Sequence, residues 1–178
     1  MPTHCGGNAR VTTVRVVTAR KSLDRAECPV SRSIEQIGEW WSILILRDAI
    51  TGITRFDDFR RHLRIGPSML TRRLRKLVAE GLLERRRYHD HPERYEYVLT
   101  RRGEQFSAVV LALAGWWNDA VEPQCRSIVV VDAETGAEVE PVVVDARTGA
   151  RLAWPRHVFA AGPGASPQAR ARLPAVVT

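Results

Sequence analysis

The sequence lacks the features that mark secreted and membrane-spanning proteins. Its three cysteines, Cys5, Cys28 and Cys125, lie far apart, which fits neither a disulfide framework nor a metal-binding spacing but does fit a reducing compartment. No charged start is followed by an apolar run and a cleavage site, so we predict no secretory signal. The longest apolar run, residues 109–117, is far shorter than the roughly 18 residues that span a bilayer. We therefore expect a cytoplasmic protein.

Signatures of catalysis and metal binding are scarce as well. The sequence has no nucleophile elbow, phosphate-binding loop or HExxH zinc motif. Asp57 and Asp58 form an acidic pair, but both lie at an expected helix start, where capping and the helix dipole explain them. His89 and His91 would need further ligands to hold a metal, and a polar turn is the simpler interpretation. We predict neither catalytic residues nor a cofactor or metal site.

Positive charge, by contrast, is abundant and concentrated. The 178 residues carry a net charge of +7, and 44% of them are apolar, which suffices for one domain with a core and an appendage. Residues 55–102 contain 14 Lys and Arg against 7 Asp and Glu, so the excess of the whole chain lies within this segment. Such a balance indicates an acidic partner, which can be nucleic acid, an anionic membrane surface or an acidic protein.

The spacing of apolar residues predicts several helices and one hairpin. We expect a helix opened by Cys28-Pro29, helices near residues 39–50 and 54–63 (the latter capped by Thr54), and a fourth helix between Gly66 and Gly81. A β-hairpin with a tip of about five residues follows within residues 82–100, and a long last helix covers roughly residues 101–121. This order predicts a mainly α fold with a β-hairpin wing, the winged helix-turn-helix.

The fourth helix separates an apolar face from a cationic one. Leu70, Leu74 and Leu77 fall on one side, and Arg72 falls almost directly opposite, when successive residues are placed 100° apart. A solvated charged face is the ordinary explanation of such a pattern. However, no acid before Glu80 is placed to pair with these cations, and the neighbouring segments add more arginines. An α-helix fits the major groove and Arg can bond two acceptors of a guanine, so we predict double-stranded DNA as the partner.

The predicted DNA-binding residues form two groups with different roles. The residues expected to read bases are Ser68, Thr71, Arg72 and Arg75. The residues expected to contact phosphates, from the third helix, the fourth helix and the wing, are Arg60, Arg61, Arg64, Lys76, Arg85, Arg86, Arg87 and Arg94. Arg73 lies beside the apolar face, where it could pair with a neighbouring acid.

The two ends of the chain differ from its centre. We expect a disordered tail at residues 1–21 and the winged helix-turn-helix domain at residues 22–125. Residues 129–139 and 142–152 match at eight of eleven positions, which predicts two small β-hairpins within an extension at residues 126–160. Residues 161–178 are rich in Gly, Pro and Ala and are predicted to be disordered.

Several motifs together resemble the HxlR-type family of winged helix-turn-helix transcriptional regulators. They are CPV, IGEWWSILILRDAITG, RFDDFRRHL, MLTRRLRKLVAEGL and YVLTRRG, spread over residues 22–122. The resemblance implies a homodimer built from the first and last helices, with interface residues Ile34, Val110, Leu113, Trp116 and Trp117. It also implies that the fourth helix recognises an inverted-repeat operator, that the hairpin is the wing, and that the protein represses or activates transcription. The extension resembles one in which some relatives carry turn cysteines, but Thr-Gly pairs occupy these turns here, so we expect no metal there.

Cys28 is a candidate redox sensor, because a helix N-terminus stabilises a thiolate and the resemblance is to a family in which some members sense oxidants or electrophiles with a cysteine at this position. A structural cysteine at the dimer interface is the alternative. The tryptophan pairs at 40–41 and 116–117 are expected in the core and interface, although a small-molecule effector pocket between helices stays open as a second interpretation. A protein-interaction module or a non-specific architectural DNA-binding module is the rival function.

Overall fold

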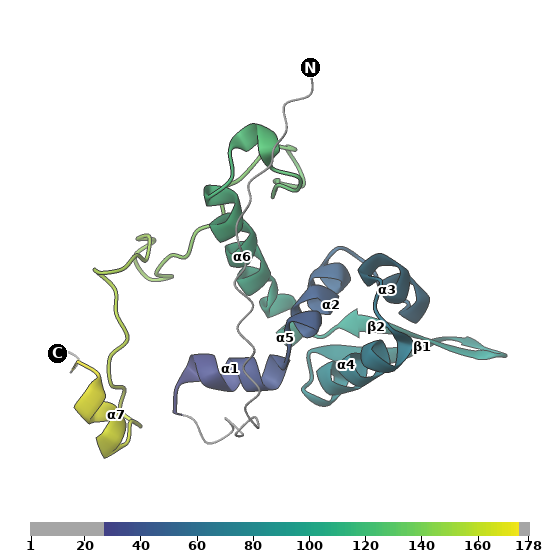
Figure 1. The fold of residues 1–178 in the computed structure, drawn as a ribbon, viewed down its shortest axis with the longest axis horizontal. Helices are drawn as coiled ribbons and strands as arrows, with labels where there is room; N and C mark the ends of the chain where they lie inside the picture. The colour runs from purple at the N-terminus through teal and green to yellow at the C-terminus, as the bar shows by residue number, and fades with distance from the viewer. Residues whose placement is uncertain (1–26, 175–178) are drawn as a thin grey trace.

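The computed structural model describes residues 27–174, in which a winged helix-turn-helix is followed by an extended carboxyl segment (Figure 1). The tail expected at residues 1–21 lies outside the described residues. The elements in chain order are α1 (Pro29–Ile37), α2 (Trp40–Ile50), α3 (Phe56–Leu63), α4 (Pro67–Ala79), β1 (Leu83–Asp90), β2 (Glu93–Leu99), α5 (Arg101–Gln105), α6 (Ser107–Asp119), the short 3-10 helix η1 (Pro123–Cys125) and α7 (Pro167–Arg172). The predicted fold class, mainly α with a hairpin wing, is confirmed.

The core lies around α2, which is apolar on most of its faces. This helix contacts α3, α4, α6 and β2, so it is the central element of the fold. The residues that form the core are Ile45, Leu46, Ala49, Phe59, Leu63, Ile65, Leu70, Leu74, Leu77, Leu82 and Leu83. All of them fall between α2 and the start of the wing, which holds the helix-turn-helix and the base of the wing together.

The helix starts follow local sequence signals, with one exception. Pro29 and Pro67 stand at the first position of α1 and α4, as predicted, and Gly66 is the N-cap of α4. The prediction that Thr54 caps α3 is wrong, because the N-cap is Arg55 and no side chain caps this helix. Acidic side chains in the first turn of α3 interact favourably with the helix dipole instead.

The last helix is divided, whereas one continuous helix over residues 101–121 is predicted. Thr100 caps α5 by accepting a hydrogen bond from the backbone of Gly103 at 3.1 Å. A Cβ atom at Gly103 would lie 2.1 Å from the carbonyl oxygen of Leu82, so only glycine lets α5 pack against the start of the wing. The chain breaks at Phe106 and α6 begins at Ser107, and α6 then leads away from the core (Figure 1).

The wing is a two-stranded antiparallel sheet that projects from the helices (Figure 1). Its register pairs Leu83 with Leu99 at the base and Asp90 with Glu93 at the tip. A β-bulge between Arg87 and His89 shifts this register. The predicted five-residue tip is wrong, because the strands extend further and only residues 91–92 connect them.

The carboxyl segment has little regular structure. Each of the two repeats is closed by a single bridge, Val131 with Glu138 and Val144 with Arg151, so the predicted hairpins are reduced to two short bridged turns. The link between the two repeats packs closely on α6, since a Cβ atom at Gly115 would lie 2.7 Å from the carbonyl oxygen of Pro141.

The end of the described chain contains a helix where disorder is predicted. Residues 167–172 form α7, and the hydroxyl oxygen of Ser166 caps it by accepting a hydrogen bond from the backbone of Ala169 at 3.1 Å. The backbone N–H of Ser166 also donates to the Glu27 carboxylate at 3.1 Å, which brings α7 next to the start of α1. Among residues 27–174, no helix combines the length and apolar character that crossing a membrane would require.

Candidate nucleic-acid interface

The outer face of α4 gathers all four residues predicted to read bases. Leu70, Leu74 and Leu77 are fully buried on the inner face of this helix. On the opposite face, an open hollow is lined by Pro67, Ser68, Thr71, Arg72 and Arg75. The helical projection is therefore confirmed as a description of which α4 residues share the exposed face.

The two arginines of this face carry charge that no acid of the described residues compensates. The guanidinium of Arg72 donates to the sulfur of Met69 at 3.0 Å, and a thioether is only a weak acceptor. Within residues 27–174, neither Arg72 nor Arg75 forms an ion pair with an acid. Their N–H donors thus remain available to an acceptor-rich partner.

The other two cations of α4 point inward or sideways. Arg73 is buried and forms an ion pair with Glu39 at the start of α2, as its place beside the apolar face suggests. Lys76 donates from Nζ to the backbone carbonyl of Glu35 in α1 at 2.8 Å, and its Nζ also lies 3.7 Å from a carboxylate oxygen of Glu80. The structure therefore places Lys76 on the α1 side of the helix, apart from the hollow that holds the predicted base readers.

The exposed arginines of α3 are partly compensated. Arg61 pairs with Asp58 at 2.9 Å, whereas Arg60, at the preceding position of the helix, is exposed. Arg64 ends α3 in the left-handed conformation, with φ of 51°, and its side chain is exposed. These three cations flank the amino end of α4, because residues 64–66 alone connect the two helices.

The wing carries four arginines, but its acids compensate them. Arg86 pairs with Glu96 across the strands at 2.8 Å, and Arg87 pairs with Asp90 and Glu93 at 3.1 Å each. The hydrogen bond from Arg86 lowers the pKa of the Glu96 carboxyl group, so this acid stays charged. The guanidinium carbon of Arg85 lies 3.5 Å from the centre of the Tyr95 ring, while Arg94 is exposed at the tip. With four arginines and four acids between residues 83 and 99, the wing has no net charge.

Apolar side chains predicted to form a dimer interface are exposed on α1 and α6. Trp116 and Trp117 retain 74% and 63% of their accessible surface, and Ile34 and Leu113 are also exposed, whereas Val110 is half-buried. Trp41 packs against the core, and Trp40 stacks on it with ring centres 3.9 Å apart. Large exposed apolar side chains therefore lie on both elements expected to pair, and more of them lie in the carboxyl segment between Ile128 and Leu173.

A family profile matches the region that contains these elements. The profile of the HxlR-like helix-turn-helix proteins aligns with residues 36–125. The chain belongs to the HxlR-like helix-turn-helix family. It is therefore a transcriptional regulator of the winged-helix type, and DNA is its partner.

Relatives of this HxlR-like protein extend the similarity beyond the matched region. Rv3095 of Mycobacterium tuberculosis, an uncharacterised HTH-type transcriptional regulator, is 34% identical over 136 residues that cover 76% of this chain and 86% of the relative. The solved structure of PA1374 from Pseudomonas aeruginosa, a proposed transcription factor, is 46% identical, with 82% of this chain and all of that chain covered and a TM-score of 0.59. PA1607, another proposed transcription factor, is 32% identical, with 79% and 99% covered and a TM-score of 0.70.

Cys28 of this HxlR-like protein is an exposed free thiol at the N-cap of α1. Hydrogen bonds from the backbone and hydroxyl of Ser31 and from the backbone of Val30 lower the pKa of the Cys28 thiol, and the charge of Arg172 acts in the same direction. The sequence does not indicate that Arg172 lies near Cys28, although the Ser166-Pro167 start of α7 is a recognisable helix signal. Cys125 is disulfide-bonded, so the expectation of three reduced cysteines is wrong for this residue.

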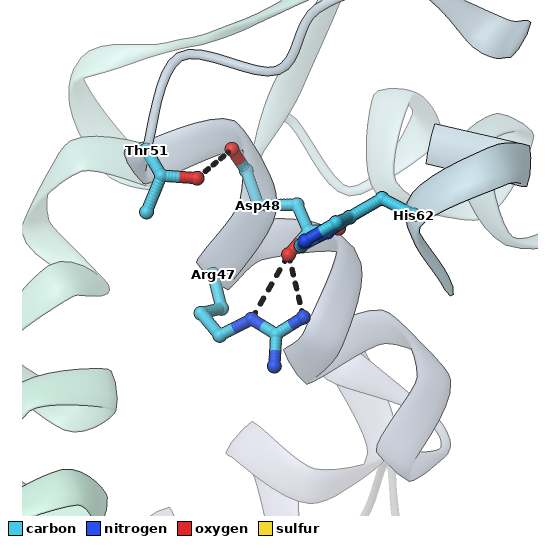
Figure 2. A network of polar contacts seen from close by, with 4 residues as sticks. All are labelled: Arg47, Asp48, Thr51 and His62. Carbon is cyan, nitrogen blue, oxygen red and sulfur yellow. Dashed lines mark hydrogen bonds and ion pairs between the residues drawn. The ribbon is translucent and has the colours of Figure 1, made fainter. Parts of the chain in front are cut away.

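A buried carboxylate, which the sequence analysis does not single out, joins α2 to α3 (Figure 2). Asp48 Oδ1 accepts from the Nε and Nη2 atoms of Arg47 at 2.9 and 2.6 Å, and Asp48 Oδ2 lies 2.7 Å from His62 Nδ1. Thr51 Oγ1 donates to the backbone carbonyl of Asp48 at 2.8 Å. The signal in the sequence is the single acid, next to Arg47, in the mostly apolar stretch of α2.

Proposed function

We propose that this HxlR-like protein is a homodimeric, sequence-specific DNA-binding regulator that reads an inverted-repeat operator with α4. In dimers of this kind, two recognition helices enter successive major grooves about 34–36 Å apart. The observation that carries the proposal is the outer face of α4, where Ser68, Thr71, Arg72 and Arg75 line one open hollow. Because both arginines lack acidic partners within the described residues, their donors are available to base edges. Such a regulator would act in the cytoplasm.

Phosphate contacts would come from α3 and the wing. The exposed Arg60 and Arg64 can approach phosphates directly, whereas Arg61 must first exchange Asp58 for a phosphate oxygen. The wing residues Arg85, Arg86, Arg87 and Arg94 would contribute in the same way, and Arg86 and Arg87 would also exchange a carboxylate partner. We leave Lys76 out of this set, because α1 and Glu80 hold its ammonium group.

The dimer would form through α1 and α6. Burying the exposed rings of Trp116 and Trp117 against a second copy removes a large apolar area from water, which is the main driving force of such association. Trp116→Ala should therefore yield monomers with much weaker operator binding, as measured by analytical ultracentrifugation. A wild-type protein that sediments as a monomer contradicts this part of the proposal.

Cys28 is proposed as the site of redox or electrophile control. A lowered thiol pKa increases the fraction of thiolate, which is the nucleophile that oxidants and electrophiles attack. Titration of the thiol in the folded protein checks the premise. A measured pKa at or above the ordinary value of about 8.5 contradicts the sensing role.

Selection of bound fragments from genomic DNA tests the central proposal. A sequence-specific regulator should enrich a two-fold symmetric site and bind it roughly 10³-fold or more tightly than random DNA at the same salt concentration. A non-specific architectural protein would show almost no such gap, and a protein-interaction module would not retard DNA at all. Either of the latter results rejects the proposed function.

A further inference from the structure

The Asp48 carboxylate is buried at a position where a hydrophobic residue would be expected. Its side chain retains 1% of its accessible surface and lies among the apolar residues of α2 that build the core. His62 of α3 and Arg47 of α2 reach it from the surface, with 57% and 38% of their side chains exposed. Both carboxylate oxygens are thus hydrogen-bonded, one within α2 and the other across to α3 (Figure 2).

The contact with His62 is directional in a way that the apolar contacts are not. His62 Nδ1 lies 2.7 Å from Asp48 Oδ2, and a hydrogen bond between these two atoms forms along one line. Phe59 and Leu63 also attach α3 to the core, but hydrophobic burial is non-directional and tolerates small rotations and shifts. A hydrogen bond between α2 and α3 is therefore suited to fix the orientation of one helix on the other, whereas the apolar side chains supply most of the attraction.

Stability alone is a poor explanation for this buried acid. Taking a carboxyl group out of water costs much of what its contacts with Arg47 and His62 contribute, and well-packed apolar replacements of buried ion pairs are often as stable or more stable. A directional role is the better physical account, because a polar link excludes alternative packings that apolar residues would accept.

We propose that Asp48 is a positioning residue that sets, through His62, the geometry of the helix-turn-helix relative to the rest of the dimer. The inference rests on the proposed DNA-binding function. α2 contacts α6, the proposed pairing helix, as well as α3 and α4. Residues 64–66 alone separate α3 from α4, so a rotation of α3 displaces the arginines at its exposed end and the amino end of α4. Two half-sites can be read together only when both recognition helices keep a fixed separation.

The decisive experiment replaces the polar link by an apolar one and measures the melting temperature, the dimeric state and the ratio of operator affinity to random-DNA affinity. The double variant Asp48→Leu with His62→Leu should have an unchanged or higher melting temperature and remain dimeric. Its ratio of operator affinity to random-DNA affinity should fall about tenfold, because electrostatic attraction to any DNA persists while the half-site geometry is lost. Glu140→Gln, which alters an exposed carboxylate of the extension, is the control that should leave the ratio unchanged.

A second pair of variants gives an answer even if the buried double variant does not fold. His62 is more than half exposed, so His62→Leu and His62→Gln leave the core intact. Gln keeps an N–H donor for Asp48 and should retain most of the affinity ratio, whereas Leu should lose it. Folded dimers whose ratio equals that of the wild type in both variants overturn the positioning role and leave the proposed function standing. A wild-type protein that does not distinguish operator from random DNA overturns the proposed function and this inference together.

Discussion

The outer face of α4 and the wing contain the same kind of residue in different electrostatic states. On α4, Arg72 and Arg75 face an open hollow with no acidic partner among the described residues. In the wing, Arg86 and Arg87 are each held by carboxylates of the same hairpin, at 2.8 to 3.1 Å. The number of cations in a segment therefore does not measure the charge it offers to DNA, because local pairing decides which cations are available.

The largest expected effect on DNA binding comes from mutating the outer face of α4, whose arginines have no acidic partner among the described residues. Arg72→Ala should cost about 1–3 kcal/mol of operator binding and relax the preference at one base pair, if Arg72 makes a bidentate contact to guanine. Titrations against the operator and its single-base variants measure both effects. Lys76→Ala on the same helix is the matched control, and it should leave the preference intact because Lys76 is directed toward α1. If Arg72→Ala and Lys76→Ala change operator affinity and base preference equally, then the outer face of α4 and its α1 side do not differ in DNA binding.

A smaller effect on DNA binding is expected in the wing, where acids of the same hairpin already pair with the arginines. Arg87→Ala should weaken binding to all DNA sequences alike and lower the salt slope by less than the roughly one unit that a free phosphate-binding cation contributes. Glu93→Gln should strengthen binding to all DNA sequences and raise the salt slope, since it removes one of the two acids that pair with Arg87. The measurement is the dependence of the logarithm of the affinity on the logarithm of the salt concentration. If Arg87→Ala lowers the salt slope by a full unit, the ion pairs of the wing do not keep Arg87 from binding phosphate.

The smallest effect concerns the stability of the wing itself. The hydrogen bond from Arg86 lowers the pKa of Glu96 below its ordinary value of 4.5. The stabilisation from this acid is therefore present above pH 4.5 and is lost as the pH falls through the lower pKa of the folded state. Glu96→Gln should flatten the acid side of the curve of unfolding free energy against pH, measured by denaturant titration beside the wild type. Identical curves would mean that the Arg86–Glu96 pair adds nothing to stability, as for many exposed ion pairs.

The parts of the fold that follow from local periodicity could be predicted from the sequence. The buried stripe of Leu70, Leu74 and Leu77 and the proline starts of α1 and α4 depend only on spacing within one helix. Lys76 could not be assigned in this way, because its partner Glu35 is 41 residues away and the docking of α1 decides where its side chain lies. The hairpin tip was misjudged because the polar residues between the aromatic positions belong to the strands.

Contacts between distant segments explain the other differences. The proximity of Arg172 to Cys28 depends on the path of the whole carboxyl segment, on which no sequence pattern reports. Asp48 is the single acid of the mostly apolar α2, and only the packing of α3 reveals that His62 is a partner. The candidate site on α4 was therefore predictable as a surface, but its electrostatic surroundings were not.

The missing side chain at Gly115 gives α6 a notch into which the Pro141 carbonyl fits. A single methyl group there would clash with this carbonyl and displace the link between the two repeats from the helix, without changing any residue of the carboxyl segment. The tryptophans that follow the notch would keep their exposed rings. Gly115→Ala thus offers a way to ask what the carboxyl segment contributes to the regulator without deleting any of it.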